Sequence, residues 1–321
     1  MKYILFLGGN GFLGKNVLDH YYEGHGLAED IHFVVVGATK PIAPDNIPSD
    51  RLSYHTLDFS DKAALELLFK IYTFSEVFHF VSATVPANSN QEMSKDIGTN
   101  LLGTIGLLEL MVQYGATKIM YMSSGGAIYG DSMEGGSEET DFNNPNNSYG
   151  IVKLTIEKYI LLFSKLHGLD YLIFRLSNPF GPHHTSSRNG IVNIAIRKAI
   201  RKEPVVIWGD GLNTKDYIYA KDFAGIFWML YEKDIKNQIL NVGSGKVYSI
   251  IDILENIKKI IPDLHWTFEA PKSFDTKKVA FKLDALKSIL DIQNTEFLTA
   301  LKETYDWELS NTAEPINQLT N

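Results

Sequence analysis

The sequence contains no cysteine among its 321 residues. Disulfides, a cysteine nucleophile, an iron–sulfur cluster and a cysteine-ligated zinc site are therefore excluded. The apolar runs are far shorter than the roughly 20 residues that span a bilayer, so we expect no membrane partner. The N-terminus also lacks the long apolar segment of a secretory signal, and we expect a cytoplasmic protein.

Positive charge is scarce as well, since 30 Lys and Arg stand against 38 Asp and Glu, a formal net charge of −8. Broad nucleic-acid binding needs basic surface, so we expect no nucleic-acid partner. A short acidic run, Glu138, Glu139 and Asp141, is interpreted as a solvated loop. An acidic chain can still bind an anionic ligand, but only through local positive groups.

Short apolar runs alternate with helical patterns in the first half of the chain. The predicted strands are Tyr3–Leu7, Ile31–Val36, Leu52–Leu57, Val77–Val81, Lys118–Met122 and Tyr171–Leu176, and the helical patterns are Phe12–Tyr22, Lys62–Phe69, Ile97–Tyr114 and Ser148–His167. This alternation predicts an α/β fold with a Rossmann-type, doubly wound parallel sheet. Continuously apolar strands agree, because such strands are covered on both faces.

The alternation stops at residues 178–188, a loop with two prolines and two histidines. We expect residues 1–177, completed by about 216–242, to form the sheet domain. Residues 178–215 and 243–321 would form a smaller α/β C-terminal domain. His183 and His184 have no acidic partner pattern, so they are interpreted as solvent or substrate-loop groups and no metal site is predicted.

A glycine-rich segment, Gly8-Gly9-Asn10-Gly11-Phe12-Leu13-Gly14, joins the first strand to the first helix. Gly8 permits the tight turn, Gly11 lets backbone approach a pyrophosphate, and Gly14 lets the helix pack close to the sheet. Phosphates would bind the free N–H groups at the helix N-terminus, where the dipole favours negative charge. The position between a strand and a helix favours dinucleotide binding over a plain tight turn.

The end of the second strand carries no acidic residue, because Val36 is followed by Gly37-Ala38-Thr39-Lys40. NAD-binding folds usually place Asp or Glu there to bind the ribose 2′-hydroxyl. Thr39 and Lys40 would suit a 2′-phosphate, so NAD is predicted with NADP as the alternative. Asp58, after the third strand, is placed to meet the adenine, or else it is an acid at the start of the next helix.

Tyr149 and Lys153 form a YxxxK pattern. Four residues make about one helical turn, so both side chains lie on one face of the helix. A free tyrosine titrates near pH 10, and a nearby ammonium together with an oxidised nicotinamide favours the phenolate, which makes Tyr149 a candidate base. The pattern also occurs in ordinary amphipathic helices, but its place behind a nucleotide loop favours a catalytic pair.

Eight segments, in order along the chain, resemble the extended short-chain dehydrogenase/reductases, in particular the NAD-dependent sugar-nucleotide epimerase/dehydratase family (UDP-glucose 4-epimerase-like). They are GGNGFLG at Gly8, VFHFVSA at Val77, NLLGT at Asn100, YMSSGGAIYG at Tyr121, YGIVK at Tyr149, RLSNPFGP at Arg175, GDGLNTKDYIYAKD at Gly209 and LNVGSG at Leu240. The resemblance covers nearly all of the chain. It implies a nucleoside-diphosphate-sugar substrate and a homodimer formed by the helices Ile97–Tyr114 and Ser148–His167.

The resemblance also implies roles position by position. Tyr149 would be the catalytic acid/base, Lys153 its ribose-binding partner, and Ser124 the neighbouring catalytic hydroxyl. The cofactor would be bound by Gly8, Asn10, Gly11, Phe12, Leu13, Gly14, Asp58, Phe59, Phe80, Val81, Ser82, Ala83, Asn100, Met122, Ser123, Tyr149, Lys153 and Pro179. The substrate would be bound by Ser124, Gly125, Tyr149, Asn178, Val192, Val206, Trp208, Lys215, Lys272 and Asp275.

The chain departs from the family pattern in three ways. The family's catalytic Ser or Thr precedes the YG tyrosine by four residues, which is Gly125 here. We therefore assign the hydroxyl role to Ser124, with Ser123 as the fallback. Lys215 and Lys272 replace two diphosphate-binding arginines and lack the bidentate fork of a guanidinium. The third departure is the missing acid after the second strand.

Three reactions share this scaffold. Dehydratases of the family carry Asp-Glu before the YG tyrosine, where this chain has Gly126 and Ala127. A C4 epimerase needs room to turn a 4-keto intermediate, and Gly125, Gly126 and Ala127 would provide it. A reductase of a 4-keto-6-deoxy sugar nucleotide uses the same residues with exchangeable NAD(P)H. We rank the epimerase first and the reductase second, above a dehydratase or an inactive nucleotide-binding relative.

Overall fold

The computed structural model describes residues 1–23, 31–39, 51–132, 135–187, 189–270 and 278–312. Within these ranges, seven parallel strands form one sheet in the order β10-β6-β5-β4-β1-β2-β3. The strands are β1 (Lys2–Leu7), β2 (Ile31–Gly37), β3 (Leu52–Thr56), β4 (Phe74–His79), β5 (Lys118–Ser124), β6 (Asp170–Leu176) and β10 (Gln238–Val242). The predicted parallel α/β fold is confirmed.

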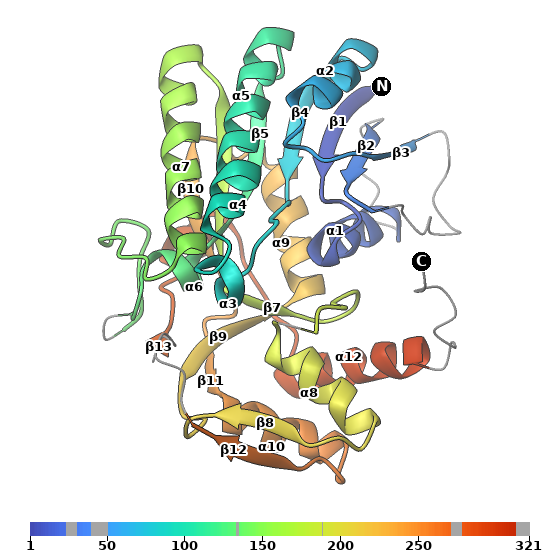
Figure 1. Ribbon diagram of the computed structural model, residues 1–321, viewed down its shortest axis with the longest axis vertical. Helices are drawn as coiled ribbons and strands as arrows, with labels where there is room; N and C mark the ends of the chain where they lie inside the picture. The colour runs from blue at the N-terminus through green and yellow to red at the C-terminus, as the bar shows by residue number, and fades with distance from the viewer. Residues whose placement is uncertain (24–30, 40–50, 133–134, 188, 271–277, 313–321) are drawn as a thin grey trace.

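Helices cover both faces of this sheet (Figure 1). α1 (Phe12–Tyr22) and α9 (Ala220–Glu232) pack together on one face, over an aromatic core that includes Phe6, Phe78 and Phe227. The other face is covered by α2 (Lys62–Ile71), α5 (Gly103–Tyr114) and α7 (Ser148–His167). The sheet is therefore doubly wound, and the apolar residues of its central strands are buried on both sides.

The predicted elements of the first half occur, with a few local differences. β4 covers Phe74–His79 rather than Val77–Val81, and β5 continues to Ser124. The helix expected over Ile97–Tyr114 begins as a π-helix, η1 (Asp96–Leu102), and becomes regular only in α5. The short helices α3 (Pro86–Ser89), α4 (Met93–Lys95) and α6 (Gly125–Ile128) were not expected from the pattern. All three lie close to the carboxyl edge of the sheet (Figure 1).

The second half builds a smaller unit beneath that edge (Figure 1). β7 (Asn178–Phe180), β9 (Thr214–Tyr219), β11 (Val247–Ser249) and β13 (Lys278–Val279) form one small sheet, and β8 (Val205–Trp208) pairs with β12 (Trp266–Glu269). Its core lies among α8 (Ile191–Ile200), α10 (Ile250–Ile260) and α12 (Phe297–Thr312). α11 (Asp284–Ile289) returns to β10 of the large sheet.

No helix in the described ranges is both long enough and apolar enough to cross a membrane.

Candidate active site

From β1 the chain adds strands first on one side of the sheet and then on the other, so the carboxyl end of β1 lies where the strand order reverses. β1 has β2 on one side and β4 on the other. Such a switch point is where parallel α/β sheets bind ligands. Gly8 turns the chain there with a φ of +80°, while its N–H donates to the Val36 carbonyl at 2.8 Å.

The turn that follows fits an anionic dinucleotide. Gly11 begins α1 and donates its N–H to the Gly8 carbonyl at 2.9 Å. A Cβ on Gly14 would lie 2.4 Å from the Gly8 carbonyl oxygen, so only glycine lets the helix approach this closely. The amide nitrogen of Asn10 is buried without a partner among the described residues and lies beside Gly37, at the end of β2. It is a donor free to bind a ribose hydroxyl or a 2′-phosphate.

Replacing Gly14 with alanine should remove NAD binding. The new methyl group would overlap the backbone of Gly8 and Gly9, so the loop has to move from the position that binds phosphate. We expect the affinity for NAD, measured by calorimetry, to fall by more than about tenfold. Gly225→Ala is the control, because a Cβ there makes only ordinary contact, at 3.5 Å, with His20. Equal affinities in the two variants would contradict the assignment of this loop.

Tyr149 reaches the end of β5 because α7 begins very close to it. A Cβ on Gly150 would lie 2.3 Å from the Ala127 carbonyl, so glycine is needed next to Tyr149. The Ser124 side chain lies near the Tyr149 hydroxyl and acts to lower the pKa of Tyr149. Lys153 donates from Nζ to the Met122 carbonyl at 2.7 Å, and its Nζ lies 5.6 Å from the centre of the Tyr149 ring. The predicted Tyr149, Lys153 and Ser124 are therefore brought together.

Burial dominates the ionisation of this pair. It raises the pKa of Tyr149 to about 12, although the nearby Ser124 side chain acts in the opposite direction. Burial also lowers the pKa of Lys153 to about 8. We expected Lys153 to favour the phenolate, but in the protein alone desolvation outweighs that attraction. A further positive charge next to the phenol is needed before Tyr149 can act as a base near neutral pH.

Ser123, the fallback for the hydroxyl role, is engaged elsewhere. Its Oγ donates to Glu157 Oε1 at 2.6 Å, and Glu157 forms a buried ion pair with Arg175, from Nη2 to Oε2, at 2.8 Å. Ser124 is the last residue of β5, and its side chain lies near the Tyr149 hydroxyl.

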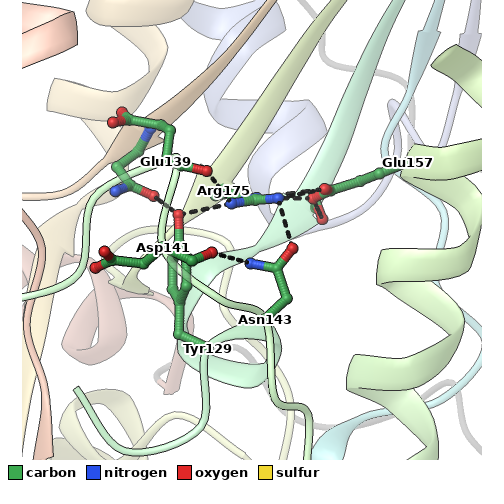
Figure 2. Close-up of polar contacts among 8 residues, drawn as sticks. Tyr129, Glu139, Asp141, Asn143, Glu157 and Arg175 are labelled. Atoms are coloured by element: carbon green, nitrogen blue, oxygen red, sulfur yellow. Dashed lines mark hydrogen bonds and ion pairs between the residues drawn. The ribbon is translucent and has the colours of Figure 1, made fainter. Parts of the chain in front are cut away.

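The ion pair lies at the centre of a buried polar network (Figure 2). Arg175 is 2% exposed and also donates to the Tyr129 hydroxyl, the Glu139 carbonyl and Asn143 Oδ1. Glu139 Oε1 accepts from the Asn241 N–H at 2.7 Å. The interpretation of the acidic run as a solvated loop is therefore wrong for Glu139, whose carbonyl and carboxylate tie this loop to β6 and β10. The partners are too distant in sequence to show in a local pattern.

The other predicted cofactor residues lie around the same edge. Phe80, Val81 and Ser82 follow β4, and the Ala83 N–H donates to Asn100 Oδ1 at 2.9 Å. Phe12 and Leu13 are half-buried in the first turn of α1. Phe59 is buried between His79 and Gly103, and Pro179 lies in β7. Asp58 accepts from the N–H and Oγ of Ser60, so it forms a turn before α2 whether or not it meets adenine.

The predicted substrate residues are more dispersed. Asn178 donates from Nδ2 to the Asp216 carbonyl at 2.9 Å, and its amide lies 4.0 Å from the position of a Cβ on Gly126. Val206 and Trp208 are partly exposed on β8, and Lys215 lies on β9. Val192 is fully buried in the smaller core, so its side chain has little surface to offer a substrate. Lys40, Lys272 and Asp275 lie outside the described residues.

Two residues near the site were missed. The Phe281 ring occupies the space at Gly125, where a Cβ would lie 2.5 Å from its Cζ, and Val279 lies near Gly126. The room expected at Gly125 is therefore filled by Phe281, and Gly126 is the small residue next to Asn178. No local signal marked Val279 or Phe281, because both approach β5 from the far end of the chain.

The loop histidines lie beside the nucleotide turn. His183 Nε2 is 2.7 Å from Asp19 Oδ2, a partner in α1 that the sequence pattern did not indicate. His184 is buried against the Phe12 ring, and burial lowers the pKa of His184 to about 4. Both histidines thus fix the 178–187 loop to α1.

Comparison with known proteins agrees with this geometry. The profile of the NAD dependent epimerase/dehydratase family matches residues 4–243. A putative UDP-glucose 4-epimerase of Methanocaldococcus jannaschii is 28% identical over 310 residues, covering 96% of this chain and 99% of that protein. A dTDP-4-dehydro-6-deoxyglucose reductase of Escherichia coli is 26% identical over 262 residues, covering 79% and 80% respectively.

A solved structure shares the whole architecture. The UDP-glucose 4-epimerase of Thermotoga maritima, crystallised with UDP-glucose, superposes with a TM-score of 0.88 at 28% identity. The superposition covers 97% of this chain and 100% of that one.

Proposed function

The chain belongs to the NAD-dependent epimerase/dehydratase family, and from that membership we propose that it is an NAD-dependent nucleoside-diphosphate-sugar 4-epimerase. The observation that carries the proposal is the Tyr149–Ser124–Lys153 group at the phosphate-binding edge of the sheet. The M. jannaschii and T. maritima proteins, both named as UDP-glucose 4-epimerases, support a uridine diphosphate sugar as the substrate.

Each residue of the group has a distinct part in the reaction. Bound NAD supplies a reversible hydride acceptor. Tyr149 takes the proton of the C4 hydroxyl as the C4 hydrogen leaves, and Ser124 holds the same oxygen by hydrogen bonding. Lys153 binds the cofactor ribose and adds positive charge near the phenol. After the 4-keto sugar has rotated to present its other face, the hydride would return to C4 from that face and Tyr149 returns the proton to the oxygen, so C4 has the opposite configuration.

The residues shortly before Tyr129 argue against a reaction that eliminates water. A dehydratase needs an acid and a base close to C5 and C6, and the segment after Ser124 offers only Gly125, Gly126 and Ala127. Asn178 and Val279 line the space at Gly126, so the site has a polar and an apolar wall where the sugar would turn.

A reductase is the second candidate. The end of β2 carries Gly37, Ala38 and Thr39 with no carboxylate, so a cofactor with a 2′-phosphate would meet no negative charge there. The similar E. coli protein is named as a reductase of a 4-keto-6-deoxy sugar nucleotide. A reductase would use Tyr149 as the acid and would exchange its cofactor in each cycle.

One experiment separates the candidates. The purified protein is denatured to release any bound cofactor, which is identified, and the native protein is incubated with a panel of UDP-hexoses. Tightly bound NAD with interconversion of C4 epimers and no net change in NADH supports the epimerase. Stoichiometric consumption of NADPH with a 4-keto-6-deoxy sugar nucleotide would support the reductase in place of the epimerase. Inactivity with the UDP-hexoses and with the 4-keto-6-deoxy sugar nucleotide would refute both functions.

We also propose a homodimer that buries the outer faces of η1, α5 and α7. Apolar side chains exposed there are Ile97, Leu102, Val112, Ile151, Leu162 and Leu166. A second copy of the same face would cover them as a four-helix interface, and contiguous exposed apolar surface of this kind marks association sites.

Light scattering should therefore give twice the 36.1 kDa of one chain. Leu162→Asp should reduce the mass to that of one chain, because a carboxylate would be buried at the interface. Leu309→Asp on α12 is a matched control, since Leu309 is 45% exposed and Leu162 is 44% exposed. A monomeric wild-type protein would contradict the dimer.

A further inference from the structure

Tyr121 is a buried tyrosine that the proposed reaction does not use. It lies in the middle of β5, and its side chain is 0% exposed. Its hydroxyl oxygen is buried and has no hydrogen-bond partner among the described residues. The contacts that this side chain makes are therefore those of its aromatic ring.

The ammonium of Lys153 lies over that ring. The distance from Nζ to the centre of the Tyr121 ring is 4.8 Å, well inside the roughly 6 Å over which a cation and an aromatic face attract one another. The face of a ring is the negative part of its quadrupole, and its attraction for a cation grows when water is excluded. Lys153 is 4% exposed and Tyr121 is fully buried, so the pair lies where this attraction is strongest.

A second neighbour of the Tyr121 ring is His79 of β4. The two ring centres are 5.3 Å apart and the planes are inclined at 63°. His79 Nε2 lies 2.8 Å from Thr104 Oγ1, and Thr104 Oγ1 donates to the Asn100 carbonyl at 2.6 Å, so Nε2 is the donor to Thr104. Burial lowers the pKa of His79 to about 3, so the imidazole is neutral. The ammonium of Lys153 is thus the cation that contacts the Tyr121 ring.

The close contacts of the ammonium are with neutral groups. One of its three N–H groups donates to the Met122 carbonyl at 2.7 Å, and the Tyr121 face is a second uncharged acceptor. Glu157, one turn further along α7, is paired instead with Arg175 at 2.8 Å. A carbonyl and a ring attract a cation without cancelling its charge. The charge of Lys153 therefore remains available to a ribose oxygen and to a phenolate.

We infer that the Tyr121 ring holds the Lys153 ammonium in the candidate active site, as an uncharged acceptor that keeps the lysine protonated without neutralising it. Tyr121 is thus a positioning residue for Lys153, and the inference rests on the proposed role of Lys153 in binding the cofactor ribose. With a weaker ring face the same ammonium would lie against an apolar wall, where the neutral amine is favoured.

The direction of the expected change follows from the surroundings of the ammonium. Burial lowers the pKa of Lys153 to about 8, although Asp96 and Glu157 act to raise it. The titratable groups that face the ammonium are His79 from β4, Tyr121 from β5, Tyr149 and Glu157 from α7, and Asp96 from η1. Weakening the attraction of the Tyr121 ring leaves the others in place and favours the neutral amine, so the titration midpoint of Lys153 must fall.

A fluorination series tests this inference. Fluorine withdraws electron density from the ring face and changes the shape of the ring little, so it weakens the attraction for a cation. Tyr121→Phe is the first variant, and phenylalanines with one, two and three ring fluorines are then incorporated at position 121. Cofactor-free protein labelled with ¹³C-lysine is titrated by NMR, with the Lys153 Cε signal assigned from Lys153→Met. We expect Tyr121→Phe to keep the wild-type midpoint and the added fluorines to lower it by about one pH unit in total.

The matched control carries the trifluorinated ring in place of Phe174. Phe174 is 0% exposed and packs against Phe223 and Phe227 in the core on the other face of the sheet. The midpoint of Lys153 should not change there. NAD binding gives a second measure: at pH 7.5 the trifluorinated ring at position 121 should weaken the affinity about threefold relative to Tyr121→Phe, and the difference should disappear at pH 6.

A midpoint that does not fall along the series, or that falls equally with the fluorinated ring at position 174, would overturn the inference. A fall in Tyr121→Phe as large as that with three fluorines would also overturn it, because the hydroxyl and not the ring face would then be responsible. The fluorinated rings leave no cavity, so the series does not depend on a variant that fails to fold. The titration uses neither cofactor nor substrate. If the midpoint falls as expected but the wild type converts no nucleotide sugar, the proposed function fails and the role of Tyr121 stands.

Discussion

Replacing Tyr149 with phenylalanine should reduce turnover by a factor of roughly 100 to 10,000, the usual contribution of a general acid/base. The change removes only the hydroxyl that lies near Ser124 and leaves the ring in place. The phosphate-binding turn at Gly8–Gly14 lies in a different element, so NAD affinity should change little. Turnover is measured with the nucleotide sugar found by the substrate panel, and NAD binding by calorimetry.

A second tyrosine on the same helix provides the control. Tyr159 lies about three turns further along α7, away from the carboxyl edge of the sheet, and packs beside the apolar core. Tyr159→Phe should retain wild-type turnover. Near-normal turnover in Tyr149→Phe would remove Tyr149 from the mechanism, and a loss of NAD binding together with turnover would indicate a structural role instead.

Replacing Glu157 with glutamine should lower the free energy of unfolding by about 3–5 kcal/mol. Arg175 would keep its charge at 2% exposure, but its partners would then be neutral: the Tyr129 hydroxyl, the Glu139 carbonyl and the Asn143 side chain. For a protein of this size the unfolding temperature should fall by roughly 5–10 °C. Scanning calorimetry measures both quantities.

Removing both charges should recover much of the lost free energy of unfolding. Glu157→Leu combined with Arg175→Met replaces the ion pair by apolar side chains, a change that is often neutral in buried positions. Glu109→Gln is the surface control, because its pair with Lys62 is about half exposed and worth at most about 1 kcal/mol. A loss in Glu157→Gln no larger than that in Glu109→Gln would contradict the idea that Arg175 needs a charged partner.

Local patterns in the sequence were sufficient for the large domain and for its family. The alternation of apolar strands and helices predicted the sheet, and GGNGFLG together with YGIVK predicted the phosphate turn and the Tyr149–Lys153 pair; the fold and the family membership are confirmed. These features are readable because they lie within one turn or one strand. The roles of the individual residues remain predictions.

The structure of the smaller domain was harder to predict from the sequence, for a physical reason. Its strands β7, β11 and β13 are two or three residues long, too short to show an alternating pattern. Val279 reaches the site through the pairing of β13 with β9, and Phe281 through a bridge to Ser137. No local signal encodes either contact. The partners of Arg175 are likewise separated from it by as many as 46 residues, as the bond to Tyr129 shows.

The π-helical turn of η1 has a consequence for chain length. In such a turn each N–H bonds five residues back, so the segment holds one residue more than an α-helix of the same shape. Deleting one residue there would restore an ordinary helix of the same shape, so the preceding turn would keep nearly the same orientation relative to α5. A deletion within the regular helix of α5 would instead rotate the preceding turn by about 100°. A change of chain length by one residue can therefore be accommodated at η1, next to Asn100, and not within α5.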